Sequence, residues 1–284
     1  MRLRSLLFVP GDRPDQMQKA LEAGADALIL DLEDSVAALR KPDAREHVAA
    51  FLARPDRVLP VFVRINSLAT AHADSDLAAL HRAGVVADAL VLPKADGAGS
   101  IAELLRRLPA AGLPEVPLLP IATETPAAVF RLAEYAQVAA HLLGLTWGAE
   151  DLPAALGAAT SREVDGRFTP PYEVVRALVL FAAHAAAVPA IEAVYPAFRD
   201  LEGLTRYAER GARDGFTGMM AIHPAQVPLI NAAFTPSAAA VDRAQRVAAA
   251  FDRQPGAGVV ALEGSMLDAP HLRQALRVLA QRPG

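Results

Sequence analysis

The chain has 284 residues, which is enough for one α/β barrel or for two smaller domains. Its 28 Lys and Arg residues and 32 Asp and Glu residues give a net charge of −4 without a block of one sign, and this disfavours a protein that binds nucleic acid through the phosphates. The absence of Cys excludes a disulfide scaffold and fits a reducing cytoplasm, where we expect the protein to be located. The first apolar run, residues 6–9, is too short for a signal peptide or a membrane span.

Short apolar segments alternate with helical patterns along most of the chain, which predicts an α/β fold. The predicted strands are residues 5–9, 27–32, 60–65, 89–92, 117–122, 140–146, 190–194 and 219–222. The predicted helices between them are residues 12–24, 42–53, 75–84, 100–108, 172–187 and 201–214, together with one that Thr125 and Pro126 begin. Residues 153–171 are expected to form an inserted loop or a short helix.

About eight strand–helix units predict a closed (β/α)₈ TIM-type barrel over residues 1–235. An open, doubly wound sheet is the alternative, because periodicity does not detect closure. Beyond residue 236 the pattern changes to a helix over 237–251, an apolar segment over 259–262 and a final helix over 270–280. Residues 236–284 are therefore expected to be a C-terminal helical appendage to the barrel.

Acidic residues follow two neighbouring predicted strands. Glu124 follows the strand at 117–122, and Glu150 and Asp151 follow the one at 140–146. The carboxyl ends of parallel strands meet at one rim, where α/β proteins bind their ligands. Because converging carboxylates repel each other, we expect a divalent cation between them. Mg²⁺ suits oxygen ligands in a chain that has no Cys and no zinc-type His spacing. Alternatively, both acids are helix-start residues that the helix dipole favours.

A glycine motif at residues 97–102 imitates a dinucleotide-binding site. It reads G-x-G-x-x-A between a predicted strand and a predicted helix. It lies in the middle of the chain, and no acid ends a strand at the interval that the dinucleotide fingerprint requires. A flexible turn before a helix is therefore the favoured interpretation.

Several motifs, in order along nearly the whole chain, resemble those of the citrate lyase beta subunit and the related malyl-CoA and citramalyl-CoA lyases. They are RSLLFVPG at 4–11, KA at 19–20, LDLEDSV at 30–36, VRIN at 63–66, LPK at 92–94, ETP at 124–126, GAED at 148–151, IHP at 222–224 and GSMLD at 264–268. The resemblance implies a magnesium-dependent carbon–carbon lyase that acts on a CoA thioester and releases a 2-oxo acid.

The resemblance also implies roles for individual residues. Glu124 and Asp151 would hold Mg²⁺, and Arg64 would bind the carboxylate of the oxo acid, a task that suits a planar guanidinium. Alternatively Arg64 is an interior arginine paired with Glu33 or with Asp31, and both descriptions can hold together. Glu33 would orient Arg64 or a metal-bound water.

The proton donor for the thioester enolate would be Asp268 or an acid of the Glu33–Asp34 pair. In the family, the acid that matches Asp268 reaches the site of a neighbouring subunit, which implies a homo-oligomer, a trimer or a multiple of one. A helix N-cap is the alternative for Asp268.

Further residues match the ligand-binding positions of the family. Arg13 and Lys19 would contact the CoA moiety, and otherwise they are solvated helix cations. The remaining members of the expected substrate-binding set are Phe8, Glu150, Ile222 and His223. Phe8 could equally be a core residue, and a lone histidine such as His223 is often structural.

Three functions follow from these expectations. The first is a lyase acting on citryl-, malyl- or citramalyl-CoA, with thioester hydrolysis on the same substrates as a variant. The second is a subunit that works only when an acyl-carrier partner delivers the thioester. The third, a binding module without chemistry, is disfavoured because Arg64, Glu124 and Asp151 are all present.

Overall fold

The computed structural model describes residues 2–282 and contains two compact units, the first spanning Leu3–Asn231 and the second comprising mainly residues 232–282. The strands of the first unit are β1 (Ser5–Pro10), β2 (Ala27–Asp31), β3 (Val61–Arg64), β4 (Ala89–Leu92), β5 (Leu118–Pro120), β6 (Ile191–Glu192) and β7 (Gly218–Ala221). Its helices are α1 (Pro14–Ala20), α2 (Lys41–Leu52), α3 (Ala71–Ala83), α4 (Ala98–Ala110), α5 (Pro126–Phe130), α6 (Asp151–Leu156), α7 (Pro170–Ala185) and α8 (Leu201–Asp214), and α9 (Val227–Ala233) follows at its end. Short 3₁₀ helices are η1 (Ala38–Arg40), η2 (Leu132–His141) and η3 (Pro224–Gln226).

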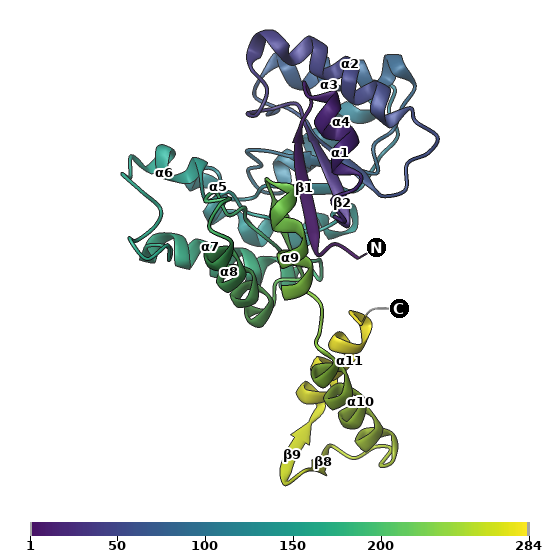
Figure 1. The fold of residues 1–284 in the computed structure, drawn as a ribbon, viewed down its shortest axis with the longest axis vertical. Helices are drawn as coiled ribbons and strands as arrows, with labels where there is room; N and C mark the ends of the chain where they lie inside the picture. The colour runs from purple at the N-terminus through teal and green to yellow at the C-terminus, as the bar shows by residue number, and fades with distance from the viewer. Residues whose placement is uncertain (1, 283–284) are drawn as a thin grey trace. The chain divides into compact units, whose positions relative to one another are not determined.

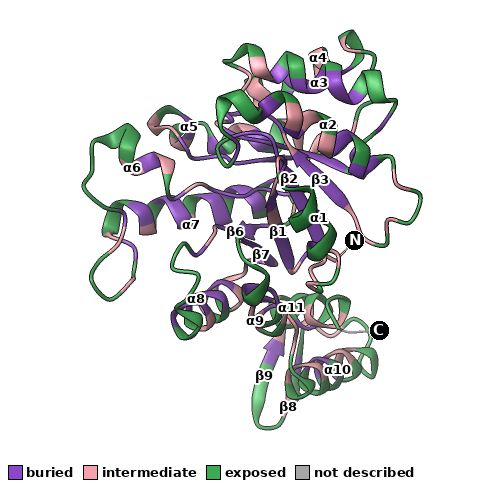
Figure 2. Cartoon of the chain, turned by 45° about the horizontal axis from the view of Figure 1, so that its top comes forward, coloured by how far each residue is buried: buried purple, intermediate pink, exposed green. Residues whose placement is uncertain are grey.

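The seven strands of the first unit form one parallel sheet in the order β5-β4-β3-β2-β1-β7-β6, which confirms the predicted α/β class (Figure 1). Side chains on both faces of its strands are buried, while the surrounding helices expose their outer sides (Figure 2). This explains why the strands are continuously apolar rather than alternating. Every pair of neighbouring strands in this sheet is parallel, so the carboxyl ends of all seven strands lie at the same edge.

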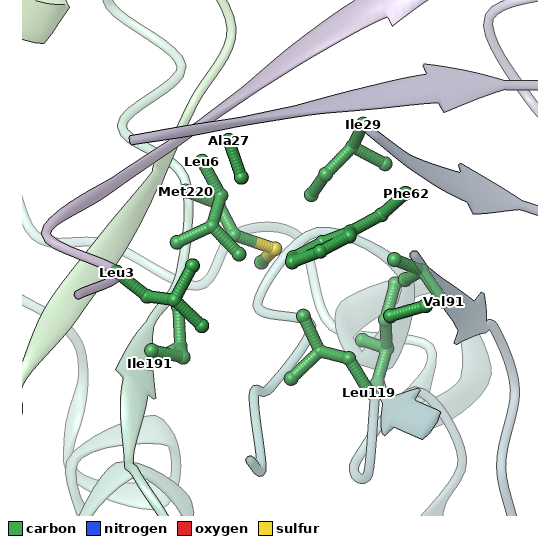
Figure 3. Close-up of a cluster of buried hydrophobic side chains, with 11 residues drawn as sticks. Leu3, Leu6, Ala27, Ile29, Phe62, Val91, Leu119, Ile191 and Met220 are labelled. Atoms are coloured by element: carbon green, nitrogen blue, oxygen red, sulfur yellow. The ribbon is translucent and has the colours of Figure 1, made fainter. Parts of the chain in front are cut away.

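One hydrophobic cluster receives a side chain from every strand of this sheet, as Figure 3 shows for most of its members. The cluster consists of Leu3, Leu6, Ala27, Ile29, Phe62, Ala89, Val91, Leu119, Ile121, Ile191 and Met220. A flat sheet cannot bring the inner faces of its first and last strands into one cluster, so the sheet is curled around this core. Phe8 and Val194 are only partly buried and pack against the same cluster.

The predicted strand at residues 140–146 is not a regular strand. Leu142, Leu145 and Thr146 make isolated parallel bridges, the first and last to the β5 region and Leu145 to Ala190 beside β6. Backbone hydrogen bonds from Leu143 to Leu118 (2.8 Å) and from Leu145 to Pro189 (2.9 Å) support these bridges. The segment is short because η2 runs to His141, which leaves few residues for an extended run.

The helix after Thr125 also differs from its prediction. The Thr125 side chain accepts a hydrogen bond from the backbone of Ala128 (3.1 Å) and caps α5 as expected, but α5 ends at Phe130 and the chain continues as η2. A 3₁₀ helix has three residues per turn, so Leu132 and Tyr135 are buried together. The spacing of Val129, Leu132, Ala133 and Ala136 predicts one apolar face of a regular α-helix. This prediction is wrong for both alanines, which are exposed.

The second unit consists of α10 (Ala238–Asp252), α11 (Ala269–Ala280) and an antiparallel pair of strands, β8 (Val259–Leu262) and β9 (Ser265–Asp268). The two helices pack side by side (Figure 1). Their buried side chains form a core that is separate from that of the first unit. Within residues 2–282 we find no helix that combines the length and the apolar character needed to cross a bilayer.

Candidate active site

A pocket of about 260 Å³ lies at the carboxyl ends of the strands in the first unit. Its polar wall consists of Asp31, Ser35, Arg64, Glu124, Glu150 and Asp151. Its other walls are formed by Phe8, Pro10, Ile121, Trp147, Gly148, Ala149, Val194, Met220 and Ile222. Ile121 and Met220 belong to the central hydrophobic cluster, so the floor of the pocket is the top of that core.

Glu124 and Asp151 enter this pocket from neighbouring segments, as predicted from the sequence. Glu124 follows β5 and is only 4% exposed, and it precedes the cap residue Thr125, so it is not a residue of the helix. Asp151 is the first residue of α6, consistent with the alternative of a helix-start acid. Thr123 connects the two segments, because its Oγ1 accepts a hydrogen bond from the backbone N–H of Gly148 (3.2 Å).

The carboxyl group of Glu124 has a raised pKa. Burial raises the pKa of Glu124 to about 8, and repulsion from Asp151 and from Glu33 adds to this effect. Desolvation and repulsion from Asp151 raise the pKa of Glu150 as well, although Arg162 opposes the shift. The raised pKa means that burial destabilises the ionised form of Glu124 by more than the hydrogen bond from the backbone N–H of Lys94 stabilises it.

The donor set fits a hard divalent cation. Two carboxylates at one pocket are the protein ligands that Mg²⁺ commonly uses, with the remaining positions filled by water and substrate oxygens. Among the described residues, no group of three or more His, Cys, Asp or Glu side chains is arranged to hold a metal. The pair could therefore hold Mg²⁺, whereas a closed zinc-type site has no basis in these residues.

Arg64 ends β3 and forms the opposite wall of the pocket. Its Nε and Nη2 atoms donate to the two carboxylate oxygens of Asp31 (2.6 and 2.7 Å), and Nη1 lies 3.2 Å from Glu33. This agrees with the alternative of an interior arginine paired with Glu33 or with Asp31, and the structure shows that Arg64 pairs with both. Burial opposes the charge on Arg64, but the two carboxylates raise its pKa above the ordinary value. The guanidinium lies 4.8 Å above the ring of Phe8, which restricts it further.

Asp31 is the fixed partner of Arg64. It is 1% exposed, and besides Arg64 it accepts hydrogen bonds from the backbone of Glu33 (2.9 Å) and of Ser35 (3.0 Å). Burial alone would raise the pKa of Asp31, but these donors hold it below its usual value. Asp31 is therefore an anchor for the guanidinium.

Lys94 connects the acids on the two sides of the site. It follows β4 in the left-handed region, with φ of 50°, a conformation that costs a non-glycine residue about 1 kcal/mol. Its backbone N–H donates to Glu124, and its ammonium group pairs with Glu33 and with Asp34 (3.1 Å). Local strain of this kind is typical of residues whose geometry a site fixes.

The structure brings together six of the residues that the sequence singled out, namely Phe8, Arg64, Glu124, Glu150, Asp151 and Ile222. Glu33 lies behind Arg64 and is buried. Arg13 and Lys19 are exposed and do not line the pocket, and Arg13 lies 3.7 Å from Asp12. His223 stacks on Phe198 outside the pocket lining, with ring centroids 5.1 Å apart.

Asp268 belongs to the second unit, where it is the N-cap of α11, as the alternative reading expected. One of its carboxylate oxygens lies 2.6 Å from Nδ1 of His271.

Sequence reasoning did not assign site roles to Lys94 or Trp147. Lys94 belongs to the LPK motif at residues 92–94, but its left-handed backbone conformation, which directs its N–H toward Glu124, cannot be recognised from the sequence. Trp147 is the only tryptophan in the chain and directly precedes the motif at residues 148–151, so its position was the one available signal.

A parallel, curled α/β sheet with acids, an arginine and a pocket at its carboxyl rim defines an α/β protein with an enzyme-like site. The chain belongs to the HpcH/HpaI aldolase/citrate lyase family, which its residues 4–224 match.

Relatives in this family are similar over almost the entire chain. A citrate lyase subunit beta-like protein of Mycobacterium tuberculosis is 40% identical over 96% of this chain and 93% of its own length. A (3S)-malyl-CoA thioesterase of Cereibacter sphaeroides is 35% identical, with coverage of 98% and 94%. A crystal structure of CitE from Mycobacterium tuberculosis in complex with magnesium, acetoacetate and coenzyme A has a TM-score of 0.82 and 38% identity, and the match covers 99% of this chain and 98% of that one.

Proposed function

We propose that the protein is a Mg²⁺-dependent carbon–carbon lyase that cleaves a 3-hydroxyacyl-CoA thioester to a shorter acyl-CoA and a 2-oxo acid. The observation that carries this proposal is the pocket that the acids Glu124 and Asp151 line together with the partly buried, charged Arg64. The solved relative that binds magnesium, acetoacetate and coenzyme A supports it. The proposal includes closure of the curled sheet into a (β/α)₈ barrel through the bridged segment at residues 142–146.

Glu124 and Asp151 would hold the Mg²⁺. When bound, this ion would supply Lewis-acid polarisation and a template for the oxygens of the oxo acid. The backbone N–H of Lys94 donates a hydrogen bond to the carboxylate of Glu124 and so orients this metal ligand. The hydrogen bond from the backbone of Gly148 to Thr123 keeps the turn at residues 148–151, which carries Asp151, close to the end of β5.

Arg64 would bind the carboxylate of the oxo acid. A guanidinium has five N–H groups. Hydrogen bonds to Asp31 engage two of them, and the third nitrogen, Nη1, lies 3.2 Å from Glu33 as an ion pair without a hydrogen bond. The other N–H groups remain for the substrate, and Asp31 keeps the planar group oriented before the substrate arrives. Glu33 is held by Arg64 and by Lys94, so we assign it the task of orienting the arginine.

The apolar walls of the pocket favour a small oxo acid with one carboxylate. Arg64 is the only Lys or Arg side chain among the residues that line it, and Phe8, Ile121, Val194, Met220 and Ile222 are among its apolar residues. A second carboxylate buried there without a partner would cost several kcal/mol. Glyoxylate or pyruvate, and hence malyl- or citramalyl-CoA, fits these charges better than the oxaloacetate half of citryl-CoA.

Cleavage leaves an electron pair on the carbon next to the thioester carbonyl, and this carbon must gain a proton. We assign that proton to Asp268, supplied by the extension at residues 236–284 of a neighbouring subunit. This assignment makes a homo-oligomer part of the working enzyme. Arg13 and Lys19 would bind the CoA phosphates outside the pocket, and His223 would contact the same ligand. We expect the protein to be located in the cytoplasm.

Thioester hydrolysis is the second candidate, because one relative is named a (3S)-malyl-CoA thioesterase. The two reactions differ in their products: the lyase releases a 2-oxo acid and leaves the thioester of the shorter acyl group intact, whereas the thioesterase releases free CoA. A third arrangement, a subunit that needs an acyl-carrier partner, would cleave only thioesters linked to that carrier.

The test is a panel of malyl-, citramalyl- and citryl-CoA, each assayed with Mg²⁺ and with chelator. Oxo acid is followed as its phenylhydrazone, and free CoA by thiol titration. We expect Mg²⁺-dependent oxo acid from malyl- or citramalyl-CoA, and loss of turnover in Asp151→Asn. Glu209→Gln, an exposed carboxylate change on α8, is the matched control. Turnover that survives in chelator, or free CoA without oxo acid, would contradict the proposal.

A further inference from the structure

A further buried carboxylate, Glu192, is hydrogen-bonded to the pocket-wall residue Trp147, and the proposed function does not use it. Glu192 is the last residue of β6 and has no exposed surface. Its Oε1 atom accepts hydrogen bonds from the indole Nε1–H of Trp147 (2.6 Å), from the hydroxyl of Tyr207 (2.7 Å) and from the backbone of Ala193 (3.0 Å). Its Oε2 atom accepts one from Nε of Arg176 (2.7 Å).

Stability alone gives this network little reason to exist. A buried ion pair is often no more stable than well-packed apolar side chains of the same volume, because both charges lose their hydration. Arg176 is 4% exposed and is paired at its other end with Asp214 (2.7 Å), so two buried charges join α7, α8 and β6. The network does fix the orientation of each side chain that donates a hydrogen bond to Glu192.

Trp147 is the donor that matters for the site. It is fully buried, yet it forms part of the pocket wall. Its ring packs against Phe168 with centroids 4.9 Å apart, and Phe168 packs against Tyr207 at 5.9 Å. Aromatic packing alone tolerates rotation of the indole, but Nε1–H is the only polar group of this side chain, so its bond to Glu192 sets the rotation.

The backbone connects Trp147 directly to the metal-binding turn. Residues 148–151 follow it and carry Asp151, and Gly148 approaches so closely that a Cβ atom there would lie 2.5 Å from Cγ of Glu124. A small displacement of Trp147 would therefore move both this close contact and Asp151 relative to Glu124.

We propose that Glu192 is a positioning residue, which holds Trp147 and through it the turn at residues 148–151 in the geometry that lets Asp151 and Glu124 share one divalent cation. This inference rests on the proposed function of the site. Glu192 contacts neither substrate nor metal in this role.

The experiment measures Mg²⁺ affinity in the full-length protein. Trp147 is the only tryptophan, so its fluorescence reports directly on the pocket wall during a Mg²⁺ titration, and calorimetry gives the same affinity without a fluorophore. Glu192→Gln keeps the volume but turns an amide N–H₂ toward Arg176 or toward Trp147. Trp147→Phe keeps Glu192 and the aromatic packing but removes the N–H donor. Asp214→Asn breaks the same network at its far end without touching Trp147.

Removal of such an outer contact commonly weakens metal binding 10- to 100-fold. We expect this loss for Glu192→Gln and for Trp147→Phe, a shifted Trp147 emission in Glu192→Gln without metal, and a change of no more than about twofold for Asp214→Asn. Circular dichroism and the unfolding temperature establish that each variant is folded. If Glu192→Gln does not fold, Trp147→Phe decides the question.

The inference is overturned if folded Glu192→Gln or Trp147→Phe binds Mg²⁺ within twofold of the unmodified protein, or if Asp214→Asn loses as much affinity as they do. Both results leave the lyase activity of the unmodified protein intact. An unmodified protein that neither binds Mg²⁺ nor cleaves any thioester would instead overturn the proposed function, and this inference with it.

Discussion

Without metal, Glu124 should destabilise the protein at neutral and alkaline pH. Burial raises its pKa to about 8 from a model-compound value of 4.5. For an acid whose pKa is higher in the folded state than in the unfolded state, the stabilisation is fully present below the unfolded value and is lost as the pH rises through the folded value. The metal-free protein should therefore lose stability between about pH 4.5 and pH 8.

The size of this loss follows from the shift. One pKa unit corresponds to about 1.4 kcal/mol, so a rise of roughly 3.5 units corresponds to about 5 kcal/mol at most. Glu124→Gln removes the ionisation but retains an oxygen that can accept the backbone N–H of Lys94. We expect this variant, without metal at pH 8.5, to unfold at most roughly 10–20 °C above the unmodified protein, at about 2–4 °C per kcal/mol.

The assay is thermal unfolding from pH 5 to pH 9, with chelator and with saturating Mg²⁺. In chelator, the melting temperature of the unmodified protein should fall with pH, and that of Glu124→Gln should fall much less. Added Mg²⁺ should restore the unmodified protein at pH 8.5 and leave the variant unchanged. If Glu124→Gln is less stable than the unmodified protein at pH 8.5 in chelator, Glu124 is not a strained carboxylate and the electrostatic argument for the cation fails.

Four further changes test other parts of the site. Arg64→Lys loses the bidentate geometry and should raise KM for the oxo acid about 10- to 100-fold in the condensation direction; an unchanged KM removes Arg64 from substrate binding. Gly148→Ala should weaken Mg²⁺ binding at least about 10-fold by displacing Glu124, measured by calorimetry against Gly99→Ala, where a Cβ meets open space. Lys41→Met removes three hydrogen bonds that hold Leu32, Glu33 and Asn66, and in urea unfolding it should cost about 2–4 kcal/mol, unlike exposed Lys19→Met. Asp268→Asn should lower kcat while Mg²⁺ affinity stays the same; full turnover would exclude it as the proton donor.

The order of strands and helices in the first unit was predictable because each buried strand is a short apolar run between helical patterns. The predictions for β4 and α8 match the structure at both ends. Convergence of Glu124 with Asp151 was also predictable, since it requires only that two parallel strands be neighbours. These features depend on the local pattern of apolar residues and on the order of the elements along the chain, and both can be determined from a single sequence.

Features that depend on contacts between distant residues were not predictable. Replacement of a regular strand by isolated bridges at Leu142, Leu145 and Thr146 depends on where η2 ends. The hydrogen bond between Glu192 and Trp147 joins residues 45 positions apart, and neither residue type announces it. Placement of Arg13 and Lys19 outside the pocket lining could not be foreseen either, because charge patterns do not reveal which side of a helix faces a ligand.

The acids at the rim fall into two sets, and this division supports the proposal that Glu124 and Asp151 hold a cation. Asp31 and Glu33 are neutralised by Arg64 and Lys94 at 3.2 Å or less. Glu124, Glu150 and Asp151 form no ion pair with a Lys or Arg side chain of residues 2–282. Burial raises the pKa of Glu124 and of Glu150, as it also does for the paired Glu33. The ion pairs of Arg64 and Lys94 go to Asp31 and Glu33, so the negative charge of Glu124 and Asp151 is left without an ion pair. In the proposed function, a divalent cation held by Glu124 and Asp151 would offset that charge and let an anionic oxo acid bind beside Arg64.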